Sequence, residues 1–159
     1  IPRLGRIMIF QFTYETVLGD VTFVEEDGAL LVISMKSDHG GKVAETPLIK
    51  DAFRQLSEYL IGERKEFDLP IRMRGTEFQK RVWRALLDIP YGETRSYKQI
   101  AEAIGNPKGV RAVGMANNRN QLLIVIPCHR VIGASGSLVG YGEGLEMKEF
   151  LLRLEKSLP

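Results

Sequence analysis

Cys128 is the only cysteine of the chain, and His129 and Arg130 follow it directly at the end of an apolar segment. A cysteine attacks a substrate at neutral pH only where a base or a positive charge favours its thiolate. His129 offers the base and Arg130 the charge, so these residues could carry out nucleophilic chemistry at sulfur. Neighbouring side chains of an extended chain point apart, so His129 would reach the sulfur through a water or a turn. The alternative is a buried, unreactive thiol, the commoner state of a lone cysteine.

A carboxylate that could orient the histidine lies near the end of the chain. Glu155 is within one helical turn of Leu151 and Leu152, which predicts that it is partly buried. A buried carboxylate needs a partner, and His129 could be that partner. Lys148 precedes Glu155 by seven residues, so the two would share a helix face. The alternative is that Glu155 is a solvated carboxylate at a helix end.

Charge is unevenly distributed along the chain. Residues 1–70 contain eight Lys and Arg against twelve Asp and Glu, residues 71–130 eleven against four, and residues 131–159 three against four. A basic middle section indicates contact with a polyanion such as nucleic acid. A solvated basic face without a partner is the alternative, and charge alone does not separate the two.

The basic section contains a helix-turn-helix pattern. A capping box at Ser96 begins a helix that ends near Gly105, and Asn106-Pro107 begins a second helix that runs to about residue 117. Two short helices joined by a tight turn are typical of DNA-binding domains. The second helix is rich in small residues, which let a helix approach a sugar-phosphate backbone closely but carry little direct base readout. Tight packing between helices is the alternative reason for small residues.

The remaining pattern predicts two units, residues 1–70 and residues 71–159. The first has three strands, a helix and a charged linker, over residues 6–14, 21–24, 29–35, 47–61 and 63–74.

In the second unit a helix opens with a capping box at Thr76 and ends before Pro90. Residues 121–126 are expected to form a buried strand that leads to Cys128. A last amphipathic helix begins near Leu145.

The sequence disfavours a membrane-spanning protein and a secreted protein. No apolar run reaches the roughly 18 residues that a membrane span needs, and the first residues lack a signal-peptide pattern. A single cysteine excludes an internal disulfide and fits a reducing compartment. We therefore expect a protein of the prokaryotic cytoplasm, or of the nucleus in a eukaryote, without a membrane partner.

Further segments accompany the cysteine motif in a consistent order. They are Pro-Tyr-Gly-Glu-Thr (90–94), Ser-Tyr (96–97), Gly-Asn-Pro-Lys (105–108), Arg-Ala-Val-Gly (111–114), Asn120, Ile-Pro-Cys-His-Arg-Val (126–131) and Gly-Tyr-Gly-Glu-Gly-Leu (140–145). In these segments the sequence resembles the O6-alkylguanine-DNA alkyltransferases, also called methylated-DNA–protein-cysteine methyltransferases. The resemblance covers residues 76–156, and the first unit resembles the family only in size and in the order of its elements.

The resemblance implies an α+β fold and a DNA-repair activity. A small N-terminal, ribonuclease-H-like domain with an antiparallel sheet and a helix would precede a mostly helical, winged helix-turn-helix domain. The family transfers an alkyl group from guanine O6 to cysteine once, without regenerating the protein, after minor-groove binding and nucleotide flipping. The implied partner is double-stranded DNA containing O6-alkylguanine, with O4-alkylthymine as a second candidate substrate. A monomer without a cofactor is expected.

The resemblance also implies a role for each matching residue at the reaction centre. Cys128 would accept the alkyl group, His129 would act as its base through a water, and Glu155 would orient His129. Asn120 would be the hinge between the DNA-binding helix and the active-site strand. Tyr97 would contact the flipped nucleotide and assist proton transfer to the leaving guanine.

Other matching residues would hold the substrate and the DNA. Tyr141 would pack on the guanine, the backbone of Gly142 and Val131 would bond its edges, and Lys148 would lie near the reaction centre. Arg111 would fill the space left by the flipped guanine. The remaining implied DNA contacts are Ser96, Lys108, Ala112 and Gly114.

The sequence departs from the family pattern in two places. Some members bind zinc through cysteines and histidines of the N-terminal domain, and this chain has no cysteine there, so no metal is expected. Gly142 stands where other members carry serine, which retains the backbone contact but changes the room for the alkyl group.

Three other functions share part of this pattern. A damage sensor of the alkyltransferase-like class would bind DNA but lacks the cysteine. A winged-helix regulator would bind an undamaged sequence and would tolerate loss of Cys128. A Cys-His-Glu hydrolase would turn over many substrates and would not need the basic helix-turn-helix.

Overall fold

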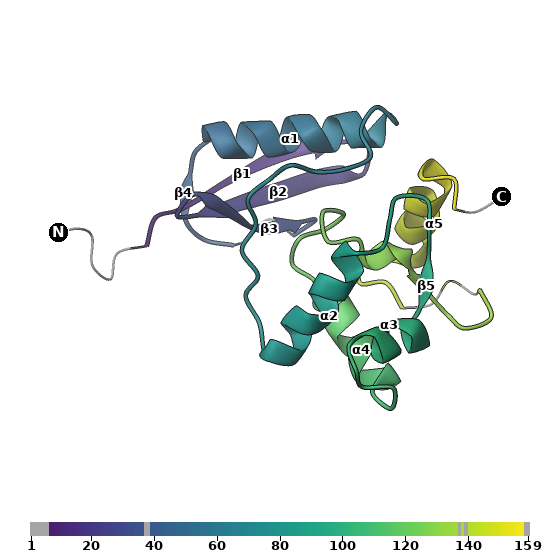
Figure 1. Cartoon of the computed structure of the whole chain (residues 1–159). Coiled ribbons are helices and arrows are strands. Elements are labelled where there is room, and N and C mark those ends of the chain that lie inside the picture. The colour runs from purple at the N-terminus through teal and green to yellow at the C-terminus, as the bar shows by residue number, and fades with distance from the viewer. Residues whose placement is uncertain (1–6, 37–38, 137, 139, 158–159) are drawn as a thin grey trace. The chain divides into compact units, whose positions relative to one another are not determined.

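The computed structural model describes residues 7–36, 39–136, 138 and 140–157 (Figure 1). Two compact units, Ile1–Met73 and Arg74–Pro159, divide the chain. Arg6, the predicted start of the first strand, lies outside the described residues. The α+β fold class is confirmed, with a sheet and a helix in the first unit and mainly helices in the second.

The first unit is built on a four-stranded sheet of order β3-β2-β1-β4. Its strands are β1 (Ile9–Thr16), β2 (Gly19–Glu26), β3 (Ala29–Ser34) and β4 (Lys42–Val43). The first three pair antiparallel, and β4 pairs parallel to β1. Asp27 and Gly28 join β2 to β3 with positive φ angles of 46° and 85°. This Asp-Gly pair is favoured in two-residue hairpin turns, where both residues have positive φ.

Helix α1 (Pro47–Leu60) lies along the sheet (Figure 1). The Thr46 hydroxyl accepts a bond from the Ile49 amide at 3.1 Å and caps the helix, and Pro47 occupies a first-turn position where its missing N–H costs nothing. The helix buries one apolar stripe, and β2 and β3 bury the facing side chains. The largest of these core side chains are Tyr59, Phe23, Leu30 and Ile49.

The prediction that residues 63–74 are only a linker is wrong in part. The Leu30 amide donates to the Pro70 carbonyl and the Arg72 amide donates to the Leu30 carbonyl, both at 2.8 Å. The Gln55 side chain also bonds both backbone groups of Asp68, at 2.9 and 3.1 Å. The segment supplies hydrogen-bond partners for backbone groups at the edge of β3. Its polar composition is therefore that of an exposed segment paired with the sheet, and not that of an unpaired linker.

The second unit packs α2 (Glu77–Leu87), α3 (Tyr97–Ala103), α4 (Val110–Asn118) and α5 (Leu145–Leu154) around one core. Both predicted capping boxes are present, at the starts of α2 and α3. The Trp83 indole donates to the Ala116 carbonyl at 2.9 Å and ties α2 to α4. The short strands β5 (Arg95–Ser96) and β6 (Val131–Ile132) pair parallel.

Helix α4 begins later than the sequence indicated. Asn106 does not cap it: the Gly109 amide donates to the Asn106 carbonyl at 2.9 Å, which closes a turn over Pro107 and Lys108. Gly109 occupies the N-cap position without a side-chain bond. The Asn-Pro pair therefore forms the tight turn between the helices, a use that the same residues also favour.

Residues 121–126 do not form the predicted strand. Ile124 has a φ of 72°, and amide bonds from Val125 to Leu123 and from Ile126 to Leu122, at 2.8 and 3.0 Å, fold the segment into tight turns. Four of its apolar side chains, those of Leu122, Leu123, Ile124 and Ile126, are nonetheless buried, as predicted, and Val125 is half-buried. A short apolar run predicts that the segment is buried, but it does not predict its backbone conformation. The left-handed conformation is costly for β-branched isoleucine, so the surrounding packing must hold it.

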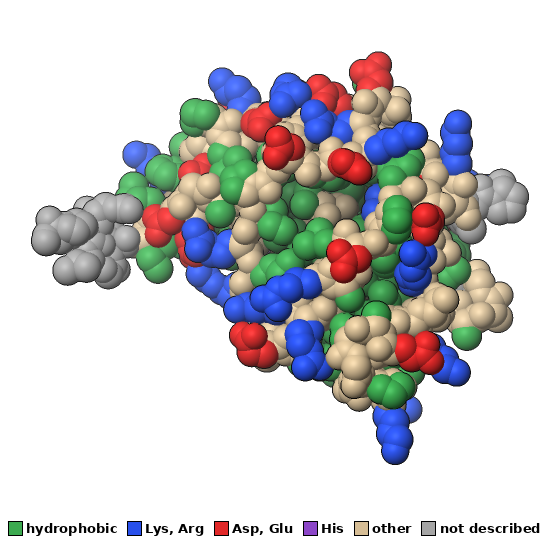
Figure 2. Space-filling view, viewed as in Figure 1, with side chains coloured by type: hydrophobic (Ala, Val, Ile, Leu, Met, Phe, Trp, Pro, Cys, Tyr) green, Lys and Arg blue, Asp and Glu red, His purple; other side chains and the backbone are tan. Residues whose placement is uncertain are grey.

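The surface of the described residues is charged and mixed. Figure 2 shows Lys and Arg side chains interspersed with Asp and Glu over the face in view. None of the helices in the described ranges is both long enough and apolar enough to cross a membrane.

Candidate active site

Cys128 lies in a single 3₁₀ turn, Cys128–Arg130, that follows the folded apolar segment. Its amide donates to the Ile126 carbonyl at 2.8 Å, and its side chain is buried with 6% exposure. The turn replaces the extended chain assumed for these residues, so His129 and Arg130 both enter the core beside the cysteine. A thiol buried in this way is protected from bulk solvent and reacts only with a group that enters the core.

Asn120 connects the end of α4 to the sulfur. Its Nδ2 lies 3.2 Å from Cys128 Sγ and donates to the Ile126 carbonyl at 2.8 Å, while its Oδ1 accepts from the Leu122 amide at 2.9 Å. The two backbone partners belong to the tight turns that precede the cysteine. The sequence-predicted hinge position is therefore in direct contact with the thiol.

The ionisation of Cys128 is set by opposing effects. Burial raises the pKa of its thiol, because an apolar environment disfavours the thiolate. The Asn120 hydrogen bond, the charge of Lys148 and the Tyr141 hydroxyl act in the other direction and lower this pKa. Burial dominates, so the thiol keeps its proton until a base removes it.

His129 is placed to be that base. Its Nε2 and Glu155 Oε2 are 2.8 Å apart, and both side chains are fully buried. Burial lowers the pKa of His129 although the Glu155 bond raises it, so the imidazole is neutral at pH 7. Because the Glu155 carboxylate accepts the bond, Nε2 carries the proton and Nδ1 is free to accept one. The predicted contact between His129 and Glu155 is present.

Arg130 has a role that the sequence did not indicate. Its guanidinium donates to both carboxylate oxygens of Glu155, at 2.8 and 2.9 Å, and to the Ile89 carbonyl at 2.7 Å. The charge offered for the thiolate is thus directed at Glu155, which corrects the first expectation for this residue. Fixed by the guanidinium, Glu155 holds His129 in one tautomer and one orientation.

Lys148 and Tyr97 complete the surroundings of the sulfur. The ammonium of Lys148 lies 5.9 Å from the centre of the Tyr97 ring, and burial lowers the pKa of Lys148 from 10.5 to about 8. The Tyr97 hydroxyl donates to the Gly140 carbonyl at 3.1 Å. Burial, and then the charge of Cys128, raises the pKa of this hydroxyl. The positive charge that favours the thiolate therefore comes from Lys148.

The predicted substrate residues lie in two places around the cysteine. Val131 directly follows the 3₁₀ turn, is fully buried and opens β6. Tyr141 is buried with 9% exposure, whereas Gly142 is exposed. Gly142 lies near α4, because a Cβ built on it would meet the Asn118 carbonyl at 3.6 Å. The loop that carries these residues therefore lies beside the end of α4.

The predicted DNA residues lie mostly on the exposed side of the helix-turn-helix. Lys108 is exposed in the turn before α4, and Arg111 and Ala112 are exposed in the first turn of the helix. Gly114 faces inward, 3.8 Å from the Tyr97 ring when a Cβ is added to it. The Ser96 hydroxyl accepts from the Gln99 amide at 3.0 Å and is the N-cap of α3. All five predicted DNA residues lie in α3, in α4 or directly beside these helices, and none lies in the first unit.

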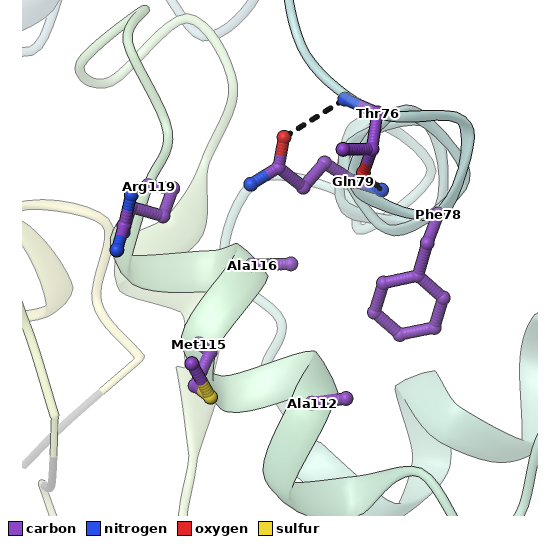
Figure 3. A pocket seen from close by; sticks show the side chains of 7 residues that line it. All are labelled: Thr76, Phe78, Gln79, Ala112, Met115, Ala116 and Arg119. Carbon is purple, nitrogen blue, oxygen red and sulfur yellow. Dashed lines mark hydrogen bonds between the residues drawn. The ribbon is translucent and has the colours of Figure 1, made fainter.

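A pocket of about 270 Å³ opens between the start of α2 and α4. Figure 3 shows Ala112 and Ala116 of α4 facing Phe78 of α2 across it, with the Thr76–Gln79 capping bond at the rim. The small side chains of α4 therefore leave open space on this side of the helix, rather than serving only close helix contact.

Asn117 is a second residue that the sequence reasoning missed. It is buried, and its Nδ2 donates to the Cys128 carbonyl at 3.4 Å. The available signal was its position one helical turn before Asn120. In the described ranges, the acidic, histidine and cysteine side chains form no cluster that could hold a metal ion.

Comparison with known proteins matches most of the chain, in both units, to one family. The family model of the 6-O-methylguanine DNA methyltransferase DNA-binding domain matches residues 77–157, and that of the ribonuclease-like domain of the same family matches residues 9–73. The methylated-DNA–protein-cysteine methyltransferase of Methanosarcina acetivorans is 51% identical over 153 residues, 91% of this chain and 96% of that protein. The constitutive methylated-DNA–protein-cysteine methyltransferase of Bacillus subtilis is 46% identical over 159 residues, 94% of this chain and 96% of that protein.

Solved structures give the same result. The crystal structure of Mycobacterium tuberculosis OGT in complex with DNA is 47% identical and superimposes with a TM-score of 0.87 over 93% of each chain. An O6-methylguanine DNA methyltransferase from Methanococcus jannaschii is 29% identical, with a TM-score of 0.68 over 92% of this chain and 93% of that one. The chain therefore belongs to the 6-O-methylguanine DNA methyltransferase family.

Proposed function

We propose that this protein repairs DNA by moving the alkyl group of O6-alkylguanine onto Cys128, once per molecule. The observation that carries the proposal is the buried group of Cys128, His129 and Glu155, with the half-buried Asn120 in contact with the sulfur, in a domain with a helix-turn-helix. The relatives named methylated-DNA–protein-cysteine methyltransferase support the reaction, and a relative solved in complex with DNA supports the partner.

The proposed reaction has two proton transfers and one substitution. His129 takes the thiol proton through a water, which leaves a thiolate at Cys128 beside the charge of Lys148. The sulfur lone pair attacks the alkyl carbon, the carbon–O6 bond breaks and its electrons go to the guanine. Tyr97 assists the return of a proton to the guanine. The product is a neutral thioether, and because the carbon–sulfur bond is not activated for a second displacement, the protein reacts only once.

DNA recognition in this proposal uses the exposed side of the helix-turn-helix. The alkylated base must leave the stack to reach a sulfur with 6% exposure. Arg111 of α4 takes the place of the flipped base, with Lys108, Ala112 and Ser96 near the DNA backbone, whereas Gly114 faces inward and lets α4 lie close to Tyr97. Tyr141, Gly142 and Val131 hold the guanine.

The remaining proposals concern the state of the protein. A reaction that needs a free thiol fits a reducing compartment, in which DNA is also present, so we place the protein in the cytoplasm of a prokaryote or the nucleus of a eukaryote. One chain carries every group that the reaction uses, which fits a monomer.

Intact mass tests the proposal directly. Mixing the protein with duplex DNA that carries one O6-methylguanine should add one methyl group, mapped to Cys128 and saturating at one event per molecule. Cys128→Ala should abolish the gain and retain DNA binding, because the side chain is buried away from the DNA-facing residues. Binding without any mass gain in the unaltered protein would instead indicate a damage sensor or a regulator.

A further inference from the structure

Asn117 lies on the last turn of α4 and holds the backbone of the reacting residue. It is 1% exposed, and its Nδ2 donates to the Cys128 carbonyl at 3.4 Å. Three residues later Asn120 contacts the sulfur of the same cysteine at 3.2 Å. Two asparagines on one helix end therefore fix Cys128 at both its main chain and its side chain.

The other half of the Asn117 amide has no protein partner. Asn117 Oδ1 is buried and accepts no hydrogen bond from any residue in the described ranges. Leaving an amide oxygen unbonded in a protein core is costly, so an atom of this kind indicates a partner that the chain itself does not supply. The Asn117 amide group is held in place by the bond from its nitrogen to the Cys128 carbonyl. The direction in which Oδ1 points is therefore fixed.

A second buried polar atom, in the residue that follows the cysteine, also lacks a hydrogen-bond partner among the described residues. His129 Nδ1 has no bonding partner within the part of the chain that the structure describes. It is the ring nitrogen left to accept a proton, because Nε2 bonds Glu155 at 2.8 Å. Asn117 Oδ1 and His129 Nδ1 are both acceptors, so they cannot satisfy each other. A buried water typically makes about three hydrogen bonds to groups that would otherwise be unsatisfied.

We infer that Asn117 is a positioning residue for alkyl transfer: its Oδ1 and His129 Nδ1 bind one water between them, with the Cys128 thiol as third partner. The inference rests on the proposed function, in which a water relays the thiol proton. What it adds is the residue that orients this water, on the helix that also carries the DNA contacts.

The orientation follows from counting donors. A water that donates one O–H to His129 Nδ1 and the other to Asn117 Oδ1 has only lone pairs left for the sulfur. It must then accept the thiol proton from Cys128 as it passes its own proton to Nδ1. The products are a thiolate, an imidazolium paired with Glu155 and an unchanged water. Without the Asn117 oxygen the water can turn an O–H toward the sulfur. In that orientation it cannot accept the thiol proton, so proton transfer from Cys128 to His129 becomes slower.

Other charged and titratable groups face the same centre. They are Lys148 and Glu155 from α5 and its end, Tyr97 from α3, Tyr91 from the segment between α2 and β5, Arg130 from the 3₁₀ turn and Tyr141 from the following loop. None of them is altered by a change at Asn117, so a shift in the pH dependence of the reaction can be assigned to the relay.

The test compares Asn117→Leu with Val113→Ala. Leucine has a similar volume and removes both polar atoms, whereas Val113 is fully buried one turn earlier on α4 and reports only lost helix packing. The rate of reaction with free O6-benzylguanine is measured against pH, together with the melting temperature. We expect Asn117→Leu to react about tenfold more slowly at pH 7 and to move the rising limb of the profile up by about one pH unit. Val113→Ala should lower the melting temperature without moving the limb.

An unchanged pH profile in a folded Asn117→Leu protein would overturn the inference. If that variant does not fold, a crystal structure of the unaltered protein with resolved waters decides. One water within hydrogen-bond distance of both Asn117 Oδ1 and His129 Nδ1 is expected, and a protein partner on Oδ1 would refute it. The mass gain of the unaltered protein with O6-methylguanine DNA is measured in parallel. Its absence would refute the proposed function, whereas its presence with an unshifted variant would refute the inference alone.

Discussion

Glu155 illustrates how much of this site depends on single buried side chains. One carboxylate bonds His129 and accepts two bonds from Arg130, and all three side chains lie in the core. A buried ion pair adds little net stability when it is intact, because both charges lose their hydration. Removing one partner is costly, since the remaining charge stays buried without compensation.

Glu155→Gln should therefore lower the free energy of unfolding by about 3–5 kcal/mol, because it leaves the Arg130 guanidinium uncompensated. Urea unfolding at pH 7 measures the loss. Glu149→Gln is the matched control on α5, since it breaks an exposed pair with Arg153 at 2.7 Å. The control should cost less than about 1 kcal/mol. Equal losses for the two variants would contradict the assignment of a buried network.

Lys148 should make the stability of the protein depend on pH in the alkaline range. Its pKa in the folded protein is lowered from 10.5 to about 8, so the unfolded chain binds this proton more tightly. Stability contributed by this group therefore rises as the pH increases from about 8 to about 10.5. Relative to Lys148→Met, the unaltered protein should gain roughly 3 kcal/mol over that window. Urea unfolding of both proteins at several pH values measures the difference, and a constant difference would refute the prediction.

In the proposed function, helix α4 is the element that joins DNA recognition to the reaction. Its exposed side carries Arg111 and Met115, its buried side packs Val113 into the core, and its end contacts Cys128 through Asn117 and Asn120. A displacement of this helix on DNA would therefore be transmitted to the sulfur by direct contacts.

Arg111→Ala should separate the two roles of the helix. The side chain is exposed and has no part in the contacts of Cys128, so reaction with free O6-benzylguanine should be unchanged. Repair of O6-methylguanine in duplex DNA should slow by roughly tenfold or more, in line with the 1–3 kcal/mol typical of an arginine at a base. Single-turnover rates with both substrates measure this, and equal losses would count against a role in filling the duplex.

The second unit as a whole encloses its reacting atom within its core. Cys128, His129 and Val131 are all buried together with the apolar segment that precedes them. Cores at this density have little room for an added group. The reaction product must therefore be accommodated by displacement of the surrounding side chains.

Methylation of Cys128 should consequently destabilise the protein by about 1–3 kcal/mol, the usual cost of overpacking a core. For a chain of 159 residues this corresponds to a melting temperature lower by several degrees, on the order of 2–12 °C. Calorimetry before and after reaction with O6-methylguanine DNA measures the shift, with Cys128→Ala treated identically as the control. A higher melting temperature after reaction would contradict the prediction.

Much of this protein could be predicted from local sequence signals. Both capping boxes and the extent of α1 depend on residues that interact within a few positions, so the pattern and the structure coincide. The motif around Cys128, together with the motifs that accompany it, indicated the family for the same reason: each is a contiguous stretch.

The tertiary structure decided what these local signals leave open. The apolar run 121–126 had to be buried, but only the packing around Ile124 folds it into turns instead of a strand. Arg130 and Asn117 take their roles from Glu155 and from the Cys128 carbonyl, which are distant in sequence or belong to the main chain. Residue type determines which hydrogen bonds a side chain can make. Which of those bonds form depends on the groups that the folded chain brings within reach, and that information is not local.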